Sequence, residues 1–160
     1  MSDIAESKAM FTEISSAAMI VAVCLLIHVS GLLLMAEWVL QHREYLERTG
    51  SKLRSALLLI ALFSGIMFLH VTEASIWAGF YYNQELFKDF ESSLYFSLTS
   101  YTTIGYGDVL LPEKWRLLGA IEGVSGVLLC GVSTAFIFAV ISAMLQIRLQ
   151  QQQQQQSAAL

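Results

Sequence analysis

Charged side chains are scarce in this 160-residue sequence, at 14% of the residues against roughly 25% in ordinary soluble domains. Lysine and arginine number nine against thirteen acidic residues, so the net charge is −4 and no basic face is available to bind nucleic acid. A single proline and ten glycines exclude a collagen-like chain. Because 56% of the residues are hydrophobic, the composition predicts a membrane protein of one compact domain.

Cysteine is also rare, and its two copies, Cys24 and Cys130, both lie in apolar runs. Two isolated cysteines give neither a disulfide framework nor the ligand spacing of a zinc site. Nothing in the sequence has the pattern of a bound cofactor, and we expect none.

Three stretches are almost free of charged residues, and each is longer than the roughly 20 apolar residues that cross a membrane as a helix. They are residues 14–36, 55–84 and 117–147. A fourth charge-free stretch, residues 92–107, is too short to span and return as helix and ends in glycines. Non-helical backbone at membrane depth is tolerated where protein buries it or a water-filled path lines it. We therefore expect an all-α membrane protein with three transmembrane helices and a re-entrant segment.

The basic residues give the expected orientation. Arg43, Arg48, Lys52 and Arg54 crowd the short loop after the first span, so the positive-inside rule places this loop in the cytoplasm. In a cell membrane (plasma or inner), the N-terminus then lies outside and the C-terminus lies in the cytoplasm. The re-entrant segment enters the membrane from outside. Aromatic residues fit as anchors at the two membrane surfaces: Trp38 at the inner one, and Trp77, Tyr81, Tyr82 and Trp115 at the outer one.

The expected organisation divides the chain into five parts. They are an outer tail (1–13), a first transmembrane helix (14–41), a basic cytoplasmic loop (42–54), a pore module (55–147) and a glutamine-rich cytoplasmic tail (148–160). Within the module, the resemblance described below implies an outer helix (55–82), a pore helix (90–101), a filter (102–108) and an inner helix (116–147). The glutamine run is typical of a disordered or loosely helical segment, or it prolongs a helical bundle.

The re-entrant stretch contains Thr102-Thr103-Ile104-Gly105-Tyr106-Gly107-Asp108. A dehydrated monovalent cation needs a shell of oxygens, and backbone carbonyls supply it only if successive residues alternate between left-handed and ordinary conformations. Gly105 and Gly107 adopt left-handed conformations without steric cost. Thr103 adds a hydroxyl oxygen, while Ile104 and Tyr106 point away from the axis and brace the backbone.

This segment resembles the potassium-channel selectivity filter. From about residue 53 to 145 the chain is similar to the two-helix pore module of that family, in a bacterial branch of small channels with one extra N-terminal helix. The resemblance implies a four-fold homotetramer that conducts K⁺ and is surrounded by lipid. Its ion-binding filter residues are Thr103, Ile104, Gly105, Tyr106 and Gly107, with K⁺ ligands at the first four, and Thr102 and Asp108 support the filter. One departure is that Tyr95 and Phe96 replace tryptophans often found in the pore helix, so a different hydrogen-bond pattern is expected around the filter.

The resemblance also makes 117–145 the pore-lining helix. It places Gly126 at the position of the family's hinge glycine, although small residues also permit close helix packing. Val127, Cys130, Thr134 and Phe138 share one helical face. We interpret this face as the cavity lining, with Phe138 as a candidate gate; the alternative is an ordinary lipid or packing face.

Ionisable residues inside the spans are costly, and this makes them candidates for function. We predict a cluster of His70, Glu73 and Glu122 behind the filter, either sharing protons and sensing pH or forming a neutral hydrogen-bonded set. His28 stands alone in the first span and is interpreted as a packing histidine, and His42 as a loop residue.

Three other functions were weighed. A non-selective cation channel shares the architecture, but the intact filter motif favours K⁺ over Na⁺. A non-conducting accessory subunit would not need the row of filter oxygens. An intramembrane metalloenzyme could use His70 and Glu73, but no nucleophile or general base accompanies them, so we do not expect an enzyme.

Overall fold

The computed structural model describes residues 2–41 and 52–158, which form a helical bundle. The three long helices are α1 (Ser2–Gln41), α3 (Lys52–Asn83) and α5 (Arg116–Ala158). Two short ones lie between the last two: α4 (Phe90–Tyr101) and the 3₁₀ helix η1 (Glu113–Trp115). No β-strand occurs in these described residues, and the predicted all-α class is confirmed.

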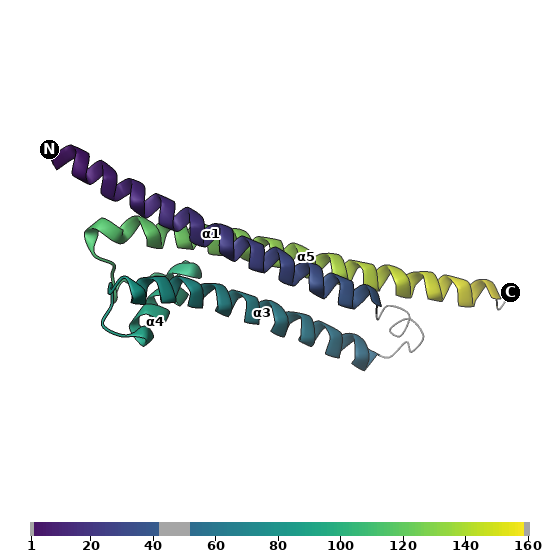
Figure 1. The fold of residues 1–160 in the computed structure, drawn as a ribbon. Coiled ribbons are helices and arrows are strands. Elements are labelled where there is room, and N and C mark those ends of the chain that lie inside the picture. Colours follow the sequence, from purple (N-terminus) through teal and green to yellow (C-terminus); the bar gives the residue numbers. More distant parts are fainter. Residues whose placement is uncertain (1, 42–51, 159–160) are drawn as a thin grey trace.

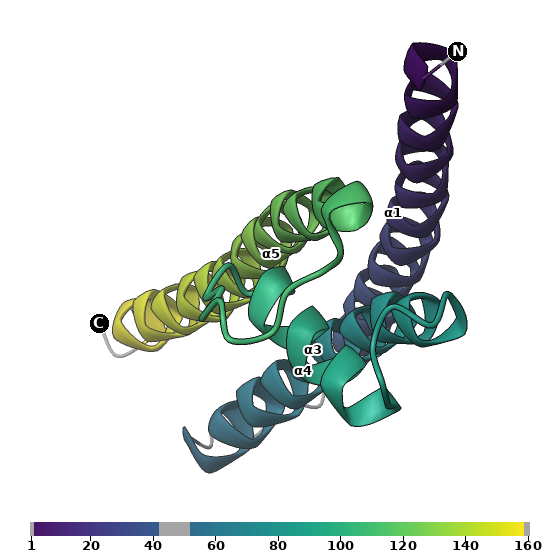
Figure 2. The same ribbon diagram turned by 90° about the vertical axis from the view of Figure 1, so that its left-hand side faces the viewer.

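Among the described residues, three helices are long and apolar enough to cross a membrane, at Met10–Gln41, Leu53–Asn83 and Glu113–Ser157. In Figure 1, α1 and α5 run in the same direction and α3 runs the opposite way, so the N- and C-termini lie at opposite ends. The helix α4 lies at one end of the bundle and packs against α3 and α5 (Figure 2). Below, the half that contains α4 is the filter half, and the other is the far half.

Each half has its own buried core. In the filter half the core is rich in aromatic and small residues from all the helices: Ala17, Ile20, Cys24, Ala74, Trp77, Tyr81, Phe96, Tyr101, Leu111, Leu118 and Leu129. In the far half the core is aliphatic: Leu32, Leu58, Leu62, Ile66, Leu69 and Ile137. Thus α1, α3 and α5 all contribute to both cores, and they connect the two halves.

Two helices extend beyond the predicted spans. The helix α1 begins at Ser2, although we predicted a tail over residues 1–13, and α5 continues through the glutamine run to Ala158. Glutamine has good helix propensity, so the run continues the helix that precedes it. Most of the predicted basic loop lies outside the described residues, including His42, Arg43 and Arg48. The orientation in the membrane therefore stays a prediction.

The predicted surface anchors need one correction. Trp77 and Tyr81 do not serve as anchors at a membrane surface, because both side chains are fully buried inside the bundle. The Tyr81 ring packs edge-on against Phe96 of α4, with ring centroids 5.4 Å apart. Packing of the pore helix on α3, which the sequence pattern does not reveal, removes these aromatic residues from the surface. Tyr82, by contrast, is exposed.

Candidate functional site: the filter segment and the ionisable groups behind it

The helix α4 ends directly before the filter segment. At its start, Asp89 is the N-cap, and its carboxylate accepts a hydrogen bond of 2.8 Å from the Ser92 amide. This bond to the charged form holds the pKa of Asp89 below its ordinary value. At its end, Thr102 is the C-cap, and its amide donates to the Leu98 carbonyl at 3.2 Å. The filter segment therefore begins where the helix exposes its last carbonyl groups.

Every second residue of the filter segment has a left-handed backbone. The φ angles are 59° at Thr103, 53° at Gly105 and 77° at Gly107. The two glycines were predicted to adopt this conformation. Thr103 was not, because a β-branched residue at positive φ is an outlier that costs about 1–3 kcal/mol. Such strain persists where the surrounding structure holds it in place.

Hydrogen bonds to α4 hold the strained segment. The Thr103 amide donates to the Ser100 carbonyl at 2.9 Å, and the Gly105 amide donates to the Thr99 carbonyl at 3.0 Å. At the other end of the segment, the Tyr95 hydroxyl donates to Asp108 Oδ2 at 2.8 Å. Tyr95 thus supplies the link between pore helix and filter at a position where the resembled family often has tryptophan.

The filter segment is unenclosed within one chain. All residues from Thr102 to Asp108 are exposed, including the large side chains of Ile104 (56%) and Tyr106 (69%). These two side chains were predicted to brace the filter against surrounding protein. Within the part of the chain that the structure describes, these two side chains are mostly exposed, so the predicted bracing stays a prediction.

Two glycines of α5 lie against the end of α4. A Cβ atom on Gly126 would lie 2.1 Å from the Tyr101 carbonyl oxygen, and one on Gly123 would lie 3.1 Å from the Ser100 carbonyl oxygen. Real Cβ contacts are never as short as the first of these. Gly126 therefore serves close helix packing, and the hinge role stays a prediction.

The predicted cavity face lies on the open side of α5. Val127, Cys130, Thr134 and Phe138 are all exposed within one chain. A hollow of about 490 Å³ lies between α5 and the filter segment, and its lining includes Thr103, Gly105 and Val127. The position of Val127 fits the predicted lining. For the other three residues, a cavity face and a lipid face are equally exposed in one chain, so their role stays a prediction.

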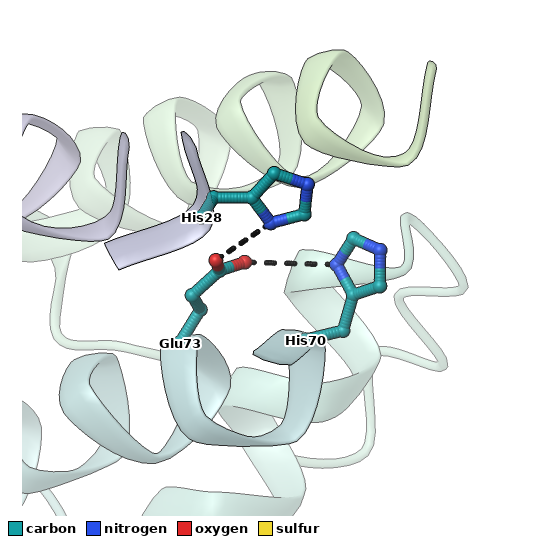
Figure 3. A group of neighbouring side chains, drawn as sticks. All are labelled: His28, His70 and Glu73. Atoms are coloured by element: carbon teal, nitrogen blue, oxygen red, sulfur yellow. Dashed lines mark hydrogen bonds and ion pairs between the residues drawn. The ribbon is translucent and has the colours of Figure 1, made fainter. Parts of the chain in front are cut away.

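Behind the filter, Glu73 is fully buried at the centre of a polar network. His28 Nδ1 lies 2.8 Å from Glu73 Oε1, and His70 Nδ1 lies 3.6 Å from Oε2 (Figure 3). The Tyr101 hydroxyl donates to Glu73 Oε2 and lies 2.9 Å from His70 Nδ1. On the other side of both rings, Ser133 Oγ lies 2.9 Å from His28 Nε2 and 3.2 Å from His70 Nε2. This network, the Glu73 network, joins α1, α3, α4 and α5.

Glu122 belongs to a second, separate set. Its Oε2 accepts a hydrogen bond of 2.7 Å from the Tyr81 hydroxyl, and its Oε1 lies 2.5 Å from Ser97 Oγ. Ser97 Oγ also lies 2.7 Å from the Ala74 carbonyl oxygen. A hydroxyl has one proton, and the carbonyl can only accept it. The Ser97 hydroxyl can donate to only one of these two oxygens, and both contacts are satisfied together when Glu122 is a neutral carboxylic acid that donates to Ser97 Oγ.

The predicted cluster of His70, Glu73 and Glu122 is therefore divided in two. The reason is the antiparallel register of α3 and α5, in which Tyr81 pairs with Glu122 and His70 pairs with Ser133. Eleven residues separate the paired positions on each helix, or about 16 Å along the axis. The sequence-based prediction estimated the depth of each residue by counting from the expected membrane surfaces, and this placed Glu122 too close to His70.

His28 is the residue that sequence reasoning missed. It was interpreted as a packing histidine, and it is indeed fully buried, but its bond to Glu73 and its place in the Glu73 network were not predicted. One signal was available, since an ionisable residue inside a span usually pairs with another. The partner itself could not be read, because no sequence pattern fixes the register of α1 against α3.

Comparison with known proteins gives one finding for the family. A family model described as "Ion channel" matches residues 56–143, which is more than half of the chain. The matched range contains α4 and the filter segment and most of α3 and α5, and it leaves α1 outside. Neither the curated proteins nor the solved structures give a match.

Proposed function

The chain belongs to the ion channel family, and from this premise we propose that it forms a potassium-selective pore in a cell membrane. The observation that carries the proposal is the alternation of left-handed residues at Thr103, Gly105 and Gly107. In a regular strand, successive carbonyls point to opposite sides. Alternating handedness turns them toward one axis, where they replace the hydration shell of K⁺. The carbonyl oxygens of Thr103, Ile104, Gly105 and Tyr106 are the proposed ligands, with the Thr103 hydroxyl at one end.

We propose that four copies surround the ion. One filter segment contributes one column of oxygens, and a closed cyclic assembly is the usual way to complete a ring from identical chains. The exposure of Ile104 and Tyr106 supports this, because a neighbouring copy would cover side chains that a single chain leaves bare. The carboxyl end of α4 adds to the pore, since the negative end of its dipole favours a cation nearby.

The remaining parts of the proposal follow the sequence. The N-terminus lies outside and the C-terminus in the cytoplasm, and K⁺ moves passively down its gradient without any chemical reaction. Val127, Cys130 and Thr134 line the inner cavity, and Phe138 narrows it. The hollow between α5 and the filter segment supports the cavity at Val127.

The test is the reversal potential of purified protein in a planar bilayer under opposed K⁺ and Na⁺ gradients. We expect a value near the K⁺ equilibrium potential, lost in Gly105→Ala because alanine at a φ of 53° is strained. Gly131→Ala is the matched control, since a Cβ at Gly131 meets no atom within 4 Å. A reversal near zero with robust current would instead establish a non-selective cation channel. Absence of current from a verified tetramer would favour an accessory subunit.

A further inference from the structure

His28, His70 and Glu73 turn three donor atoms toward one point between α1 and α3 (Figure 3). Ligand atoms of these residues all lie within 4.8 Å of one another. We propose that the three side chains bind a divalent transition-metal ion such as Zn²⁺. The site lies outside the filter, and one of its ligands comes from α1, which the family match does not include.

The position of Ser133 is compatible with metal binding by both histidine rings. Both Nε2 atoms face Ser133 Oγ, and the one hydroxyl proton can serve only one of them. Two Nε2–H groups, in contrast, would both be accepted by the two lone pairs of that oxygen. In this tautomer both Nδ1 atoms lack a proton and can bind a cation together with the Glu73 carboxylate. Without a cation, one ring can instead donate its Nδ1–H to Glu73 and accept from Ser133, so a bound metal would select the tautomer with two Nε2–H groups.

The same arrangement is common around metal-binding histidines. A ligating histidine usually donates its second ring N–H to a fixed acceptor, which orients the ring and selects the tautomer. Ser133, 4% exposed, would serve as that acceptor for both rings at once. The hydroxyl of Tyr101 contacts both Glu73 and His70 Nδ1, so a fourth oxygen lies at the same point.

The donor set determines the class of ion. Two imidazole nitrogens and one carboxylate oxygen are typical ligands of zinc, at about 2.0–2.2 Å. Ca²⁺, Mg²⁺ and K⁺ prefer oxygens alone, and so they are poor occupants. His28 and Glu73 are fully buried, so the site excludes a large hydration shell.

A route to the site leads from the open face of α5. Cys130 is exposed there, and its Sγ lies 3.9 Å from His70 Nε2. The His70 side chain is 16% exposed, while those of His28 and Glu73 are not exposed at all. An ion would therefore reach His70 first. Once bound, it would tie α1 to α3 next to Tyr101, the last residue of α4.

The experiment measures zinc bound to the purified full chain in detergent, after treatment with a chelator and re-equilibration with Zn²⁺. We expect one zinc per chain in the wild type. His28→Gln and Glu73→Gln should lose it, and Ser133→Ala should weaken the affinity about 10–100-fold. Glu122→Gln is the matched control, because Glu122 is a buried carboxylate of the separate set. Cys130→Ser controls for binding by the exposed thiol, and both controls should retain one zinc.

A wild type that retains no zinc would overturn the proposal, as would His28→Gln and Glu73→Gln proteins that bind it normally. If these variants do not fold, the absorption spectrum of Co²⁺ bound to the wild type in place of zinc tests which residues hold the metal. Absorption bands of Co²⁺ bound by nitrogen and oxygen, without a thiolate charge-transfer band, are expected. A thiolate band would place the metal on Cys24 or Cys130 and contradict the site. None of these outcomes depends on K⁺ selectivity.

Discussion

The filter half and the far half of the bundle are stabilised in different ways. In the filter half, buried polar groups connect the helices: the Glu73 network joins α1, α3, α4 and α5, and Glu122 joins α5 to α3 and α4. In the far half, the core is aliphatic and is held mainly by van der Waals contacts among residues such as Leu32, Leu62 and Ile137.

The difference follows from what each half must hold. Hydrogen bonds are directional, and several of them fix the end of α4 relative to its neighbours, so the strained filter segment keeps one geometry. Apolar contacts permit small sliding movements of packed helices at little cost. We therefore expect substitutions in the filter half to be more damaging than matched substitutions in the far half.

The largest effect is expected from Gly126→Ala in the filter half. The new Cβ would lie 2.1 Å from the Tyr101 carbonyl oxygen, and backbone cannot move aside as a side chain can. We expect a loss of about 3 kcal/mol in the free energy of unfolding, the upper end for overpacking. Denaturant or thermal unfolding of the purified protein measures it.

The matched substitution is Gly65→Ala in the far half. Here the new Cβ would meet Met35 Cε at 2.5 Å, which is the end of a flexible side chain. We expect a clearly smaller loss than for Gly126→Ala. Equal losses at the two positions would contradict the contrast between a rigid filter half and an adaptable far half.

The second effect concerns the protonation of Glu122. Glutamine is isosteric with a neutral carboxylic acid, and its amide can donate to Ser97 while its oxygen accepts from Tyr81. Glu122→Gln should therefore have nearly wild-type stability. Glu122→Ala leaves the buried Tyr81 hydroxyl without its acceptor, which costs about 2 kcal/mol. Comparison of the unfolding of both variants tests this, and a strongly destabilised Gln variant would mean that Glu122 is ionised.

A third, smaller effect is expected from Leu62→Ala in the far half, where Leu62 is 2% exposed. Large-to-small substitutions leave a cavity, but lipid is as apolar as leucine, so the transfer term is mostly absent in a membrane. We expect a loss of about 1–2 kcal/mol, with no change in ion selectivity in the bilayer assay. A shift in the reversal potential would show that the far half also controls the filter geometry.

The sequence predicted the parts of this comparison that depend on local patterns. The three spans follow from charge-free runs, and the left-handed glycines follow from the filter motif. The left-handed conformation was predicted for the two glycines alone, although the required alternation also includes Thr103, whose amide donates to the Ser100 carbonyl. The pairing of His28 with Glu73 and the separation of Glu122 depend on helix register. Register is set by packing between helices, such as Gly126 against Tyr101, which no single segment encodes.

The smallest effect on stability is expected at Asp89, the exposed N-cap of α4. It tests whether the position of α4 in the filter half depends on this capping bond as well as on its buried contacts. The bond from the Ser92 amide lowers the pKa of Asp89, so the cap stabilises the protein at neutral pH and is lost as the pH falls below the ordinary Asp value of about 3.9. Asparagine caps as well but does not titrate in this range. The thermal stability of Asp89→Asn should therefore fall less than that of the wild type between about pH 6 and pH 3, while Asp89→Ala should be less stable than both at pH 6. If the wild type and Asp89→Asn lose stability in parallel, the capping bond contributes nothing, and the position of α4 depends on its buried contacts alone.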